Sequence, residues 1–483
     1  MKFGTRARRA ALGCCVALAV AGSVGYPAAA VPEPDSAALP QGLIDAVKRD
    51  LGIDPAEYLQ RVDITHRLAE FAKTARLAHP AAFAGIRMDG GRPVVSLTDG
   101  VSAENARAAA QAAGFAVESV ADSEATLRNR RSTFERWLVG QSTTTVQSIA
   151  GYGIDVAANS LAVRLAKDVQ FPAEVGPVRS VNALPLEARP DNTPLTAQAI
   201  AGEDLTGSDI VGGQSYAIVV GSETHRCSYG FNGTDADGNA VNITAGHCDP
   251  NNLVDEADRT KEPQRVFATF AAQDGMKLPQ GEKVKHGAEL GHFDSSSFAP
   301  HDYGILRINK ESAKRFQNNL VSAGKLSPAT PSVATGSSNE ELEAGSSGRP
   351  RSPVSVGTDG RQVVRIDGTT EPIAGSAICK SGFRSGYSCG IVIAANQTAM
   401  LRGIPGHDAE VIRVEDMFYT TLCGHQGDSG GPIMAGTKAV GINSAIITHI
   451  TPLDGSCGHL PVLLGQPIST VLRDNPGLTL RTK

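Results

Sequence analysis

Aromatic side chains, long apolar runs and a strong excess of one charge are all scarce in this 483-residue chain. Aromatic residues make up 5% of the sequence, whereas glycine occurs 52 times and proline 27 times, which favours a loop-rich β protein over a helical bundle. The formal net charge is −5, so composition gives no sign of a nucleic-acid partner or an anionic membrane surface. No later segment reaches the roughly 18 apolar residues of a membrane span, and we expect no membrane anchor.

The first thirty residues have the composition of an export signal. A basic start precedes the apolar run "AALGCCVALAVAGSVG", and "AAA" at 28–30 offers a small-residue cleavage site. The basic residues are Lys2, Arg6, Arg8 and Arg9. We therefore expect residues 1–30 to be a signal peptide and the protein to be secreted and extracellular.

Cysteine is missing from residues 31–226 and concentrated in the rest of the chain. An even number of cysteines in an exported protein indicates disulfide bonds, although spacing alone leaves their pairing open. The six are Cys227, Cys248, Cys379, Cys389, Cys423 and Cys457. The chain thus consists of two unlike parts.

Residues 31–200 are rich in alanine and favour a small α+β unit. Apolar spacing predicts three helices: one capped by Asp63, one from Ser102 to about Gly114, and one over 124–140. In "GYGIDVAANSLAVRL" the period changes to two around a turn at Asn159-Ser160, which predicts a β-hairpin.

From residue 210 onward, short apolar strands alternate with glycine and aspartate turns. One hairpin is predicted around Asp237-Gly238. Residues 183–209 have no sustained period and are interpreted as a linker, and the Ser-, Pro- and Gly-rich stretch 327–355 is expected to be an exposed loop.

The stretch "GDSGG" at 427–431 fits two unrelated hydrolase plans. In the nucleophile elbow of an exported esterase, a helix follows the serine and the acid and histidine come later in the chain. Here Pro432 follows Ser429 after only two glycines, and the later candidates Asp454 and His459 are crowded beside a cysteine.

The order histidine, acid, serine is also present. His247 ends an apolar strand, Asp302 precedes another, and Ser429 follows. A hydroxyl needs a base to take its proton, and the base needs a carboxylate to fix its tautomer. These three residues supply one group of each kind.

The motifs "TAGHC", "HDYGI" and "GDSGGP" resemble the chymotrypsin-like serine proteases, specifically their secreted bacterial branch of streptogrisins and α-lytic protease. The resemblance covers about 210–483 and includes the longer spacing of that branch before "DSGG", through Gly424, His425 and Gln426. It implies an all-β double β-barrel in residues 201–483. The hairpin before the linker is similar to the end of that branch's propeptides, so residues 31–200 are expected to be a propeptide that acts as a folding chaperone.

The resemblance also implies roles for individual residues. His247, Asp302 and Ser429 would form the catalytic triad, and the backbone N–H groups of Gly427 and Ser429 the oxyanion hole. Asp428 would form a structural ion pair with Lys380. The implied disulfides are Cys227–Cys248, Cys379–Cys389 and Cys423–Cys457.

The substrate pocket departs from the pattern of the relatives. Thr421 stands where a carboxylate would meet a basic substrate side chain, so we expect a preference for small or apolar residues before the scissile bond. The pocket wall, Ser-Gly-Gly in relatives, is here Ser444, Ala445 and Ile446.

Alternative readings remain open at this point. An inactive homologue could serve as a secreted binding protein, and an elbow-type esterase would require His459. His286, His292 and His301 have no spacing typical of metal ligands, so we expect neither a metal nor a cofactor. The expected partners are a peptide or protein substrate and the chain's own propeptide, and the expected state is a monomer.

Overall fold

The structure is a computed structural model. It describes residues 39–182, 209–220, 223–254, 258–268, 287–324, 354–356, 362–402, 411–446 and 461–483. The predicted signal peptide, nearly all of the predicted linker, residues 325–353, His286, Asp454, Cys457 and His459 lie outside the described residues. All described residues belong to one compact unit, Asp35–Lys483.

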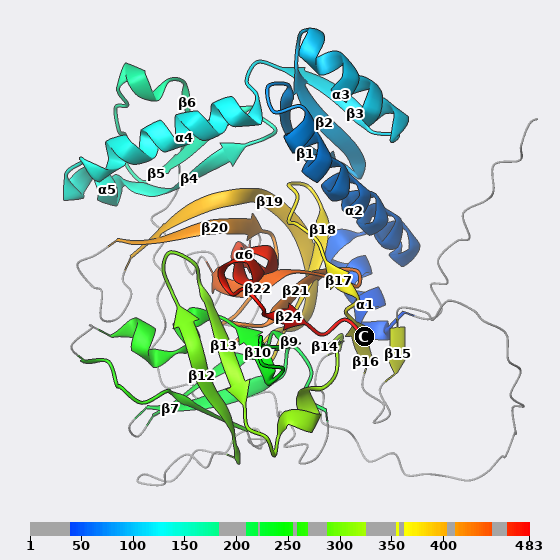
Figure 1. The fold of residues 1–483 in the computed structure, drawn as a ribbon, viewed down its shortest axis with the longest axis vertical. Coiled ribbons are helices and arrows are strands. Elements are labelled where there is room, and N and C mark those ends of the chain that lie inside the picture. The colour runs from blue at the N-terminus through cyan, green and yellow to red at the C-terminus, as the bar shows by residue number, and fades with distance from the viewer. Residues whose placement is uncertain are drawn as a thin grey trace, which may run out of the picture. The chain divides into compact units, whose positions relative to one another are not determined.

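The N-terminal region, residues 39–182, combines helices with short strands (Figure 1). Its helical segments are α1 (Gln41–Ala46), η2 (Val47–Leu51), α2 (Pro55–Ala78), α3 (Val101–Ala112), α4 (Glu124–Val139), α5 (Thr143–Ser148) and η3 (Ala173–Val175). Its strands are β1 (Phe83–Asp89), β2 (Arg92–Thr98), β3 (Ala116–Val120), β4 (Ile149–Asp155), β5 (Ser160–Leu165) and β6 (Val178–Asn182). The first three strands form a sheet of their own.

Two helix starts differ from the sequence prediction, whereas α4 and the hairpin β4–β5 are confirmed. The start of α2 at Asp63 was wrong, because Asp54 caps the helix and Pro55 occupies its first turn. The helix α3 begins at Val101, one residue before the predicted Ser102.

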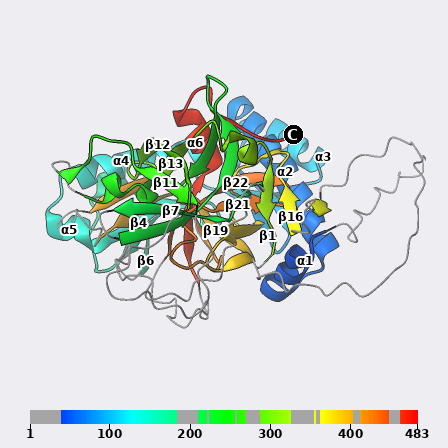
Figure 2. The same ribbon diagram turned by 90° about the horizontal axis from the view of Figure 1, so that it is seen from below.

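An eight-stranded antiparallel sheet carries the first half of the C-terminal region. Its order is β24-β9-β10-β13-β12-β11-β7-β8, and several of its strands are the green ribbons in Figure 2. The bounds are β7 (Ser215–Val220), β8 (Glu223–Ser228), β9 (Phe231–Thr234), β10 (Ala240–Thr244), β11 (Arg265–Ala268), β12 (Glu289–Ser297), β13 (Tyr303–Ile308) and β24 (Thr479–Leu480). The predicted hairpin around Asp237-Gly238 is confirmed as β9–β10.

A ten-stranded sheet carries the second half, and six of its strands close a cycle of pairings, because β18 pairs with both β21 and β19. Its strands here are β17 (Gly368–Thr369), β18 (Ala377–Gly382), β19 (Gly386–Leu401), β20 (Ile412–Thr420), β21 (Pro432–Ala435), β22 (Lys438–Ile446) and β23 (Leu463–Pro467). The remaining elements are η4 (Gly246–Cys248), η5 (Pro250–Leu253), η7 (Ala313–Phe316), β14 (Leu320–Ser322), β15 (Val354–Val356), β16 (Gln362–Arg365) and α6 (Ile468–Asp474). The region is mostly β-sheet, and the double barrel stays a prediction.

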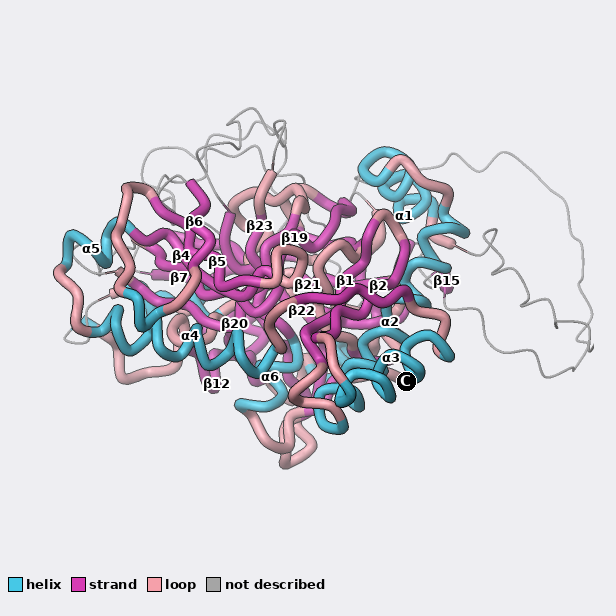
Figure 3. Tube along the Cα trace, turned by 90° about the horizontal axis from the view of Figure 1, so that it is seen from above, coloured by secondary structure: helices cyan, strands magenta, loops and turns pink. Residues whose placement is uncertain are grey.

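The N-terminal region extends this second sheet through β4, β5 and β6. Gly153 of β4 is the register partner of Gln397 in β19. Arg164 of β5 donates to Oε1 of Gln397 at 2.9 Å, and its guanidinium lies 4.3 Å from the ring centre of Tyr419. Figure 3 shows these strands beside β19 and β20, with α4 running along them. Hydrogen bonds and a stacked cation thus join the two regions.

The beginning of the N-terminal region packs into the core of the second sheet. The Tyr58 hydroxyl accepts from the N–H of Gly436 at 2.9 Å, and Asp50 Oδ2 accepts from the N–H of Cys389 at 2.8 Å. Tyr58 is fully buried. None of the helices in the described part of the chain is both long and apolar enough to span a bilayer.

Candidate active site

The ends of two neighbouring strands bring His247 and Asp302 together. Thr244, the last residue of β10, is the register partner of Gly304 in β13, and the two strands run antiparallel. The chain after β10 therefore lies beside the chain before β13. His247 is in the short 3₁₀ turn that follows β10, and Asp302 immediately precedes β13.

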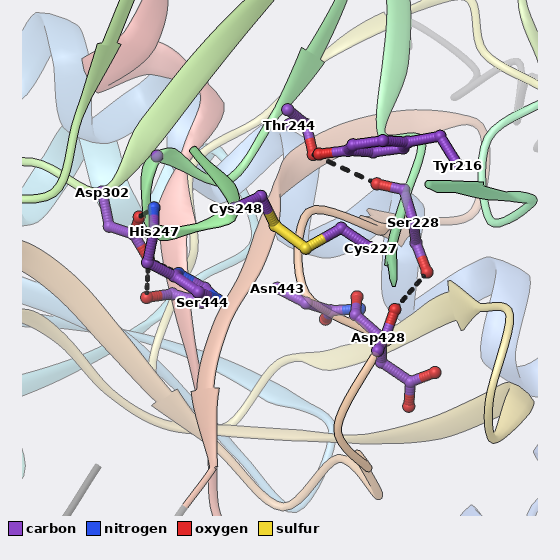
Figure 4. The surroundings of a disulfide bond; sticks show 12 residues. Tyr216, Cys227, Ser228, Thr244, His247, Cys248, Asp302, Asp428, Asn443 and Ser444 are labelled. Carbon is purple, nitrogen blue, oxygen red and sulfur yellow. Dashed lines mark hydrogen bonds and ion pairs between the residues drawn. A yellow bond between two sulfur atoms is a disulfide. The ribbon is translucent and has the colours of Figure 1, made fainter. Parts of the chain in front are cut away.

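Two hydrogen bonds hold the histidine on the carboxylate (Figure 4). Nδ1 of His247 lies 2.8 Å from Oδ2 of Asp302, and the backbone N–H of His247 donates to Oδ1 at 2.9 Å. Asp302 is fully buried, and its own N–H donates to Oε1 of Gln466 at 2.9 Å. Ser444 Oγ donates to the same carboxylate oxygen that faces the imidazole. The carboxylate can thus accept a hydrogen bond from a protonated Nδ1, which leaves Nε2 as the basic nitrogen of the ring.

The surroundings raise the pKa of His247 above its ordinary value. Burial by itself lowers this pKa, but the charge of Asp302 and the hydrogen bond to it outweigh burial. The imidazolium that would form during proton transfer is therefore stabilised by its partner.

The nucleophile loop, residues 423–431, lies against the strand end that leads to His247. The carbonyl oxygen of Ser429 accepts from the N–H of Ser228 at 2.8 Å. A Cβ atom on Gly430 would collide with the Thr244 hydroxyl and lie 3.0 Å from the nitrogen of Ala245. The loop that carries Ser429 therefore contacts Ser228, Thr244 and Ala245, although about 180 positions separate Ser429 from His247 in the sequence. Within the described residues, no hydrogen bond joins the Ser429 hydroxyl to His247.

Two disulfides fix the surroundings of this loop. Cys227, just before Ser228, is bonded to Cys248, just after His247, and Cys379 is bonded to Cys389. Both pairings were implied by the family resemblance. Cys423 is also disulfide-bonded, but its expected partner Cys457 lies outside the described residues.

Within the described residues, the backbone N–H groups of Gly427 and Ser429 in the nucleophile loop have no acceptor, and the same holds for Gly424 and Gln426. Gly427 has a φ of 95°, which a side chain would strain. Its carbonyl accepts from Ser228 Oγ at 2.8 Å, and the N–H of Asp428 donates to the carbonyl of His425 at 2.9 Å. Among the described residues, nothing accepts from the N–H of Gly427 or Ser429. The free donors of Gly427 and Ser429, with one residue between them in a fixed turn, can bind an oxyanion.

A buried ion pair between Lys380 and Asp428 stabilises the nucleophile loop. Nζ of Lys380 lies 2.8 Å from Oδ2 of Asp428, and their side chains are 0% and 2% exposed. Asp428 also accepts from the N–H groups of His425, Arg384 and Ser385 and from the Ser385 hydroxyl. Burial raises the pKa of Asp428, but the Lys380 charge and these hydrogen bonds outweigh burial and hold the pKa below its ordinary value.

The predicted pocket residues differ in what they contact. Thr421 Oγ1 accepts from the N–H of Ile391 at 2.9 Å. Ala445 packs on the apolar cluster that contains Leu464, whereas Ile446 packs on the cluster that contains Leu463. A Cβ on Gly424 would lie 2.5 Å from Leu463 and 3.0 Å from Ile446, so apolar side chains close around this glycine.

His292 and His301 belong to no metal site, because no cluster of three or more His, Cys, Asp or Glu in the described part of the chain could hold an ion. Instead, Nδ1 of His301 lies 2.5 Å from Oδ2 of Asp474, which ties the residue before Asp302 to α6.

Sequence reasoning missed Ser228 and Gln466. Ser228 holds the nucleophile loop through two hydrogen bonds, from its hydroxyl to the carbonyl of Gly427 and from its N–H to the carbonyl of Ser429. Gln466 accepts from the N–H of Asp302. Gln466 lies in "LGQPISTVL", a stretch that is part of the family resemblance, but nothing in that stretch indicates its contact with Asp302. For Ser228, the signal that could have drawn attention is its position directly after a disulfide cysteine.

The sequence is similar to several known proteins. No protein-family model matches the sequence. Streptogrisin-C of Streptomyces griseus is 26% identical over 471 residues, which cover 96% of this chain and 81% of that protein. Glutamyl endopeptidase 2 of the same organism is 27% identical over 259 residues, or 53% of this chain and 93% of that protein. Thermobifida fusca protease A, a solved structure, is 24% identical over 57% of this chain and all of its own, with a TM-score of 0.34.

The chain is thus similar in sequence to chymotrypsin-like bacterial serine proteases, and this similarity supports a serine endopeptidase.

Proposed function

We propose that the chain is a secreted serine endopeptidase in which Ser429, His247 and Asp302 carry the reaction. The observation that carries the proposal is the 2.8 Å contact between Nδ1 of His247 and the buried carboxylate of Asp302. This contact lies beside the loop that holds Ser429 and the free N–H groups of Gly427 and Ser429. The names of the sequence relatives point the same way.

The proposed reaction has two halves. Nε2 of His247 takes the proton of the Ser429 hydroxyl while Oγ attacks the peptide carbonyl, and the N–H groups of Gly427 and Ser429 bind the oxyanion. His247 then gives its proton to the leaving amine as the C–N bond breaks. Water, deprotonated by the same imidazole, hydrolyses the acyl-enzyme and restores the serine. Asp302 stays ionised throughout and keeps the imidazole oriented.

The chain is proposed to be made as a precursor with a signal peptide (1–30), a propeptide (31–200) and a protease domain (201–483). Two apolar clusters consist mainly of N-terminal residues, and Ile373 and Met400 of the C-terminal region pack into them. The two regions are also joined through β4 and Tyr58. The similarity to Streptogrisin-C spans 471 residues and so includes this region. The enzyme itself is proposed to cut near 200–210, and the released propeptide to have assisted folding.

The substrate pocket is proposed to favour small or apolar side chains rather than basic ones. Thr421 brings no carboxylate, and Ile446 and Leu463 narrow the space around Gly424. A peptide-library cleavage profile of the secreted enzyme tests this preference directly.

A serine-directed phosphonate probe tests the proposal as a whole. We expect the probe to label wild type but not S429A. We also expect wild type to hydrolyse peptide bonds, and both S429A and H247A to lose this activity. An unlabelled wild type would indicate an inactive homologue. Loss of activity in H459A with full activity in H247A would indicate the elbow-type esterase.

A further inference from the structure

Two arginines lie beside the nucleophile loop. Arg226 belongs to β8, and alternate side chains of a strand share a face, so Arg226 and Ser228 point the same way. The opposite face carries Cys227, which packs in the apolar cluster inside the eight-stranded sheet. Ser228 Oγ accepts from the N–H of Phe383 at 3.1 Å, and Arg384 is the next residue of that turn. The Arg226 side chain therefore faces the turn that carries Arg384.

Neither guanidinium has an acidic partner among the described residues. Arg384 donates only its backbone N–H, to Asp428, whose buried carboxylate is taken by Lys380. Burial and, after it, the charge of Arg384 lower the pKa of Arg226, in keeping with the placement of Arg226 opposite the turn that carries Arg384. Two half-buried like charges without a counter-charge are unfavourable, and an added carboxylate would relieve both.

In the proposed reaction, the two arginines would lie on the leaving-group side of the scissile bond. The acyl part of a bound peptide would pair with the end of β22 at Ser444–Ile446, on the other side of that bond. The amine leaves past His247, and the disulfide Cys227–Cys248 joins the neighbour of His247 to the neighbour of Arg226. Figure 4 shows this disulfide between the His247–Asp302 pair and Ser228. The chain after the scissile bond therefore runs toward Arg226.

We propose that Arg226 and Arg384 together bind the carboxylate of an aspartate or glutamate among the first three substrate residues after the scissile bond. The planar guanidinium matches a carboxylate with two parallel hydrogen bonds, which explains why arginine suits this role. The proposal rests on the proposed endopeptidase function and adds a specificity on the leaving-group side.

Matched quenched-fluorescent peptides test the proposal. They are identical up to the scissile bond and carry Glu, Gln or Lys at each of the three positions after it. We expect kcat/KM of wild type to be about tenfold higher for Glu than for Gln at one position, and this ratio to fall with added salt, because the attraction is electrostatic. The ratio should drop toward one in R226Q and R384Q, and Lys should become the preferred residue in R226E.

The Glu/Gln ratio is taken within each variant, so a general loss of activity cancels. R265Q is the matched control, because Arg265 lies in the same sheet but is exposed and paired with Glu289 at 3.5 Å. It should keep the wild-type ratio. Equal rates of wild type on Glu and Gln peptides, or a preference that survives in R226Q/R384Q, would overturn the proposal. Short peptide anilides, which carry no residue after the scissile bond, serve as a second substrate. If the chain is not an endopeptidase, wild type cleaves neither the peptides nor the anilides. If only the arginine proposal is wrong, wild type cleaves both without a preference for Glu.

Discussion

At the scale of single residues, the protonation of His247 decides when the proposed base can act. Its pKa is raised by Asp302, so the imidazole stays protonated to a higher pH than an ordinary histidine. Only the neutral imidazole accepts the serine proton, and kcat/KM should therefore rise with pH through an apparent pKa above about 6.5. A pH–rate profile checks this expectation, and an acid limb below that value would contradict it.

The variant D302N removes the charge that raises this pKa. The acid limb should move to lower pH, and kcat should fall on the order of 10⁴-fold because the imidazole loses its oriented tautomer. An unchanged acid limb in D302N would mean that Asp302 does not control the titration of His247.

The buried pair Lys380–Asp428 has a separate role in stability. K380M leaves the Asp428 carboxylate buried without a counter-charge and should lower the free energy of unfolding by about 3 kcal/mol. The lowered pKa of Asp428 stabilises the fold only where the carboxylate is ionised. The difference between K380M and wild type should therefore be largest near neutral pH and shrink as the pH falls toward that lowered pKa.

Denaturant unfolding in an S429A background measures this difference without self-digestion. K438M is the control, because Lys438 and Asp367 pair at 2.9 Å with side chains 26% and 48% exposed. Such an exposed pair should cost less than about 1 kcal/mol. Equal losses in the two variants would show that burial of the Lys380 pair does not matter.

At the scale of elements, β4 can pair with β19 only because glycine lets the strands approach. A Cβ on Gly151 would lie 2.7 Å from the backbone oxygen of Thr398, which cannot turn aside. G151V should weaken binding of a separately made segment 31–200 to the mature domain at least tenfold and lower the yield of active enzyme. G140A, where a Cβ would meet nothing closer than 3.6 Å, is the control. Equal affinity of G151V and wild-type segments would show that this pairing is dispensable.

Helices and hairpins that are determined by residues within one short stretch were predictable from the sequence. The helix α4 and the hairpins β4–β5 and β9–β10 follow from periodicity and turn residues within one stretch. The start of α2 was missed because its cap, Asp54, precedes the periodic stretch. The pairing of β4 with β19 joins residues about 240 positions apart and leaves no local pattern.

The same division holds in the candidate site. Motifs singled out His247, Asp302 and Ser429 as candidates, because each stands beside a distinctive turn, strand end or cysteine. The contacts of Ser228 with Gly427 and Phe383 depend on where three distant segments meet, and they could not be read from spacing.

At the scale of the whole molecule, the proposed cut should separate tryptophan from the protease domain. The single tryptophan, Trp137, lies in α4 and packs against Phe134 and Phe171 at ring-centre distances of 5.6 and 5.5 Å. The mature domain should therefore show tyrosine emission alone. The pairing of β4 with β19 and the Tyr58 contact could keep a cut propeptide attached. The domain must therefore be separated under denaturing conditions before its emission is read.

The variant S429A decides which protease makes this cut. If Ser429 performs it, S429A should accumulate as one uncut chain with tryptophan emission, and a denaturing gel should show the full precursor after removal of the signal peptide. A trace of added wild-type enzyme should then convert it, because the S429A precursor keeps the cleavage segment intact. Spontaneous conversion of S429A would assign the cut to another protease, and tryptophan in the purified mature domain would place the cut before Trp137 rather than near 200–210.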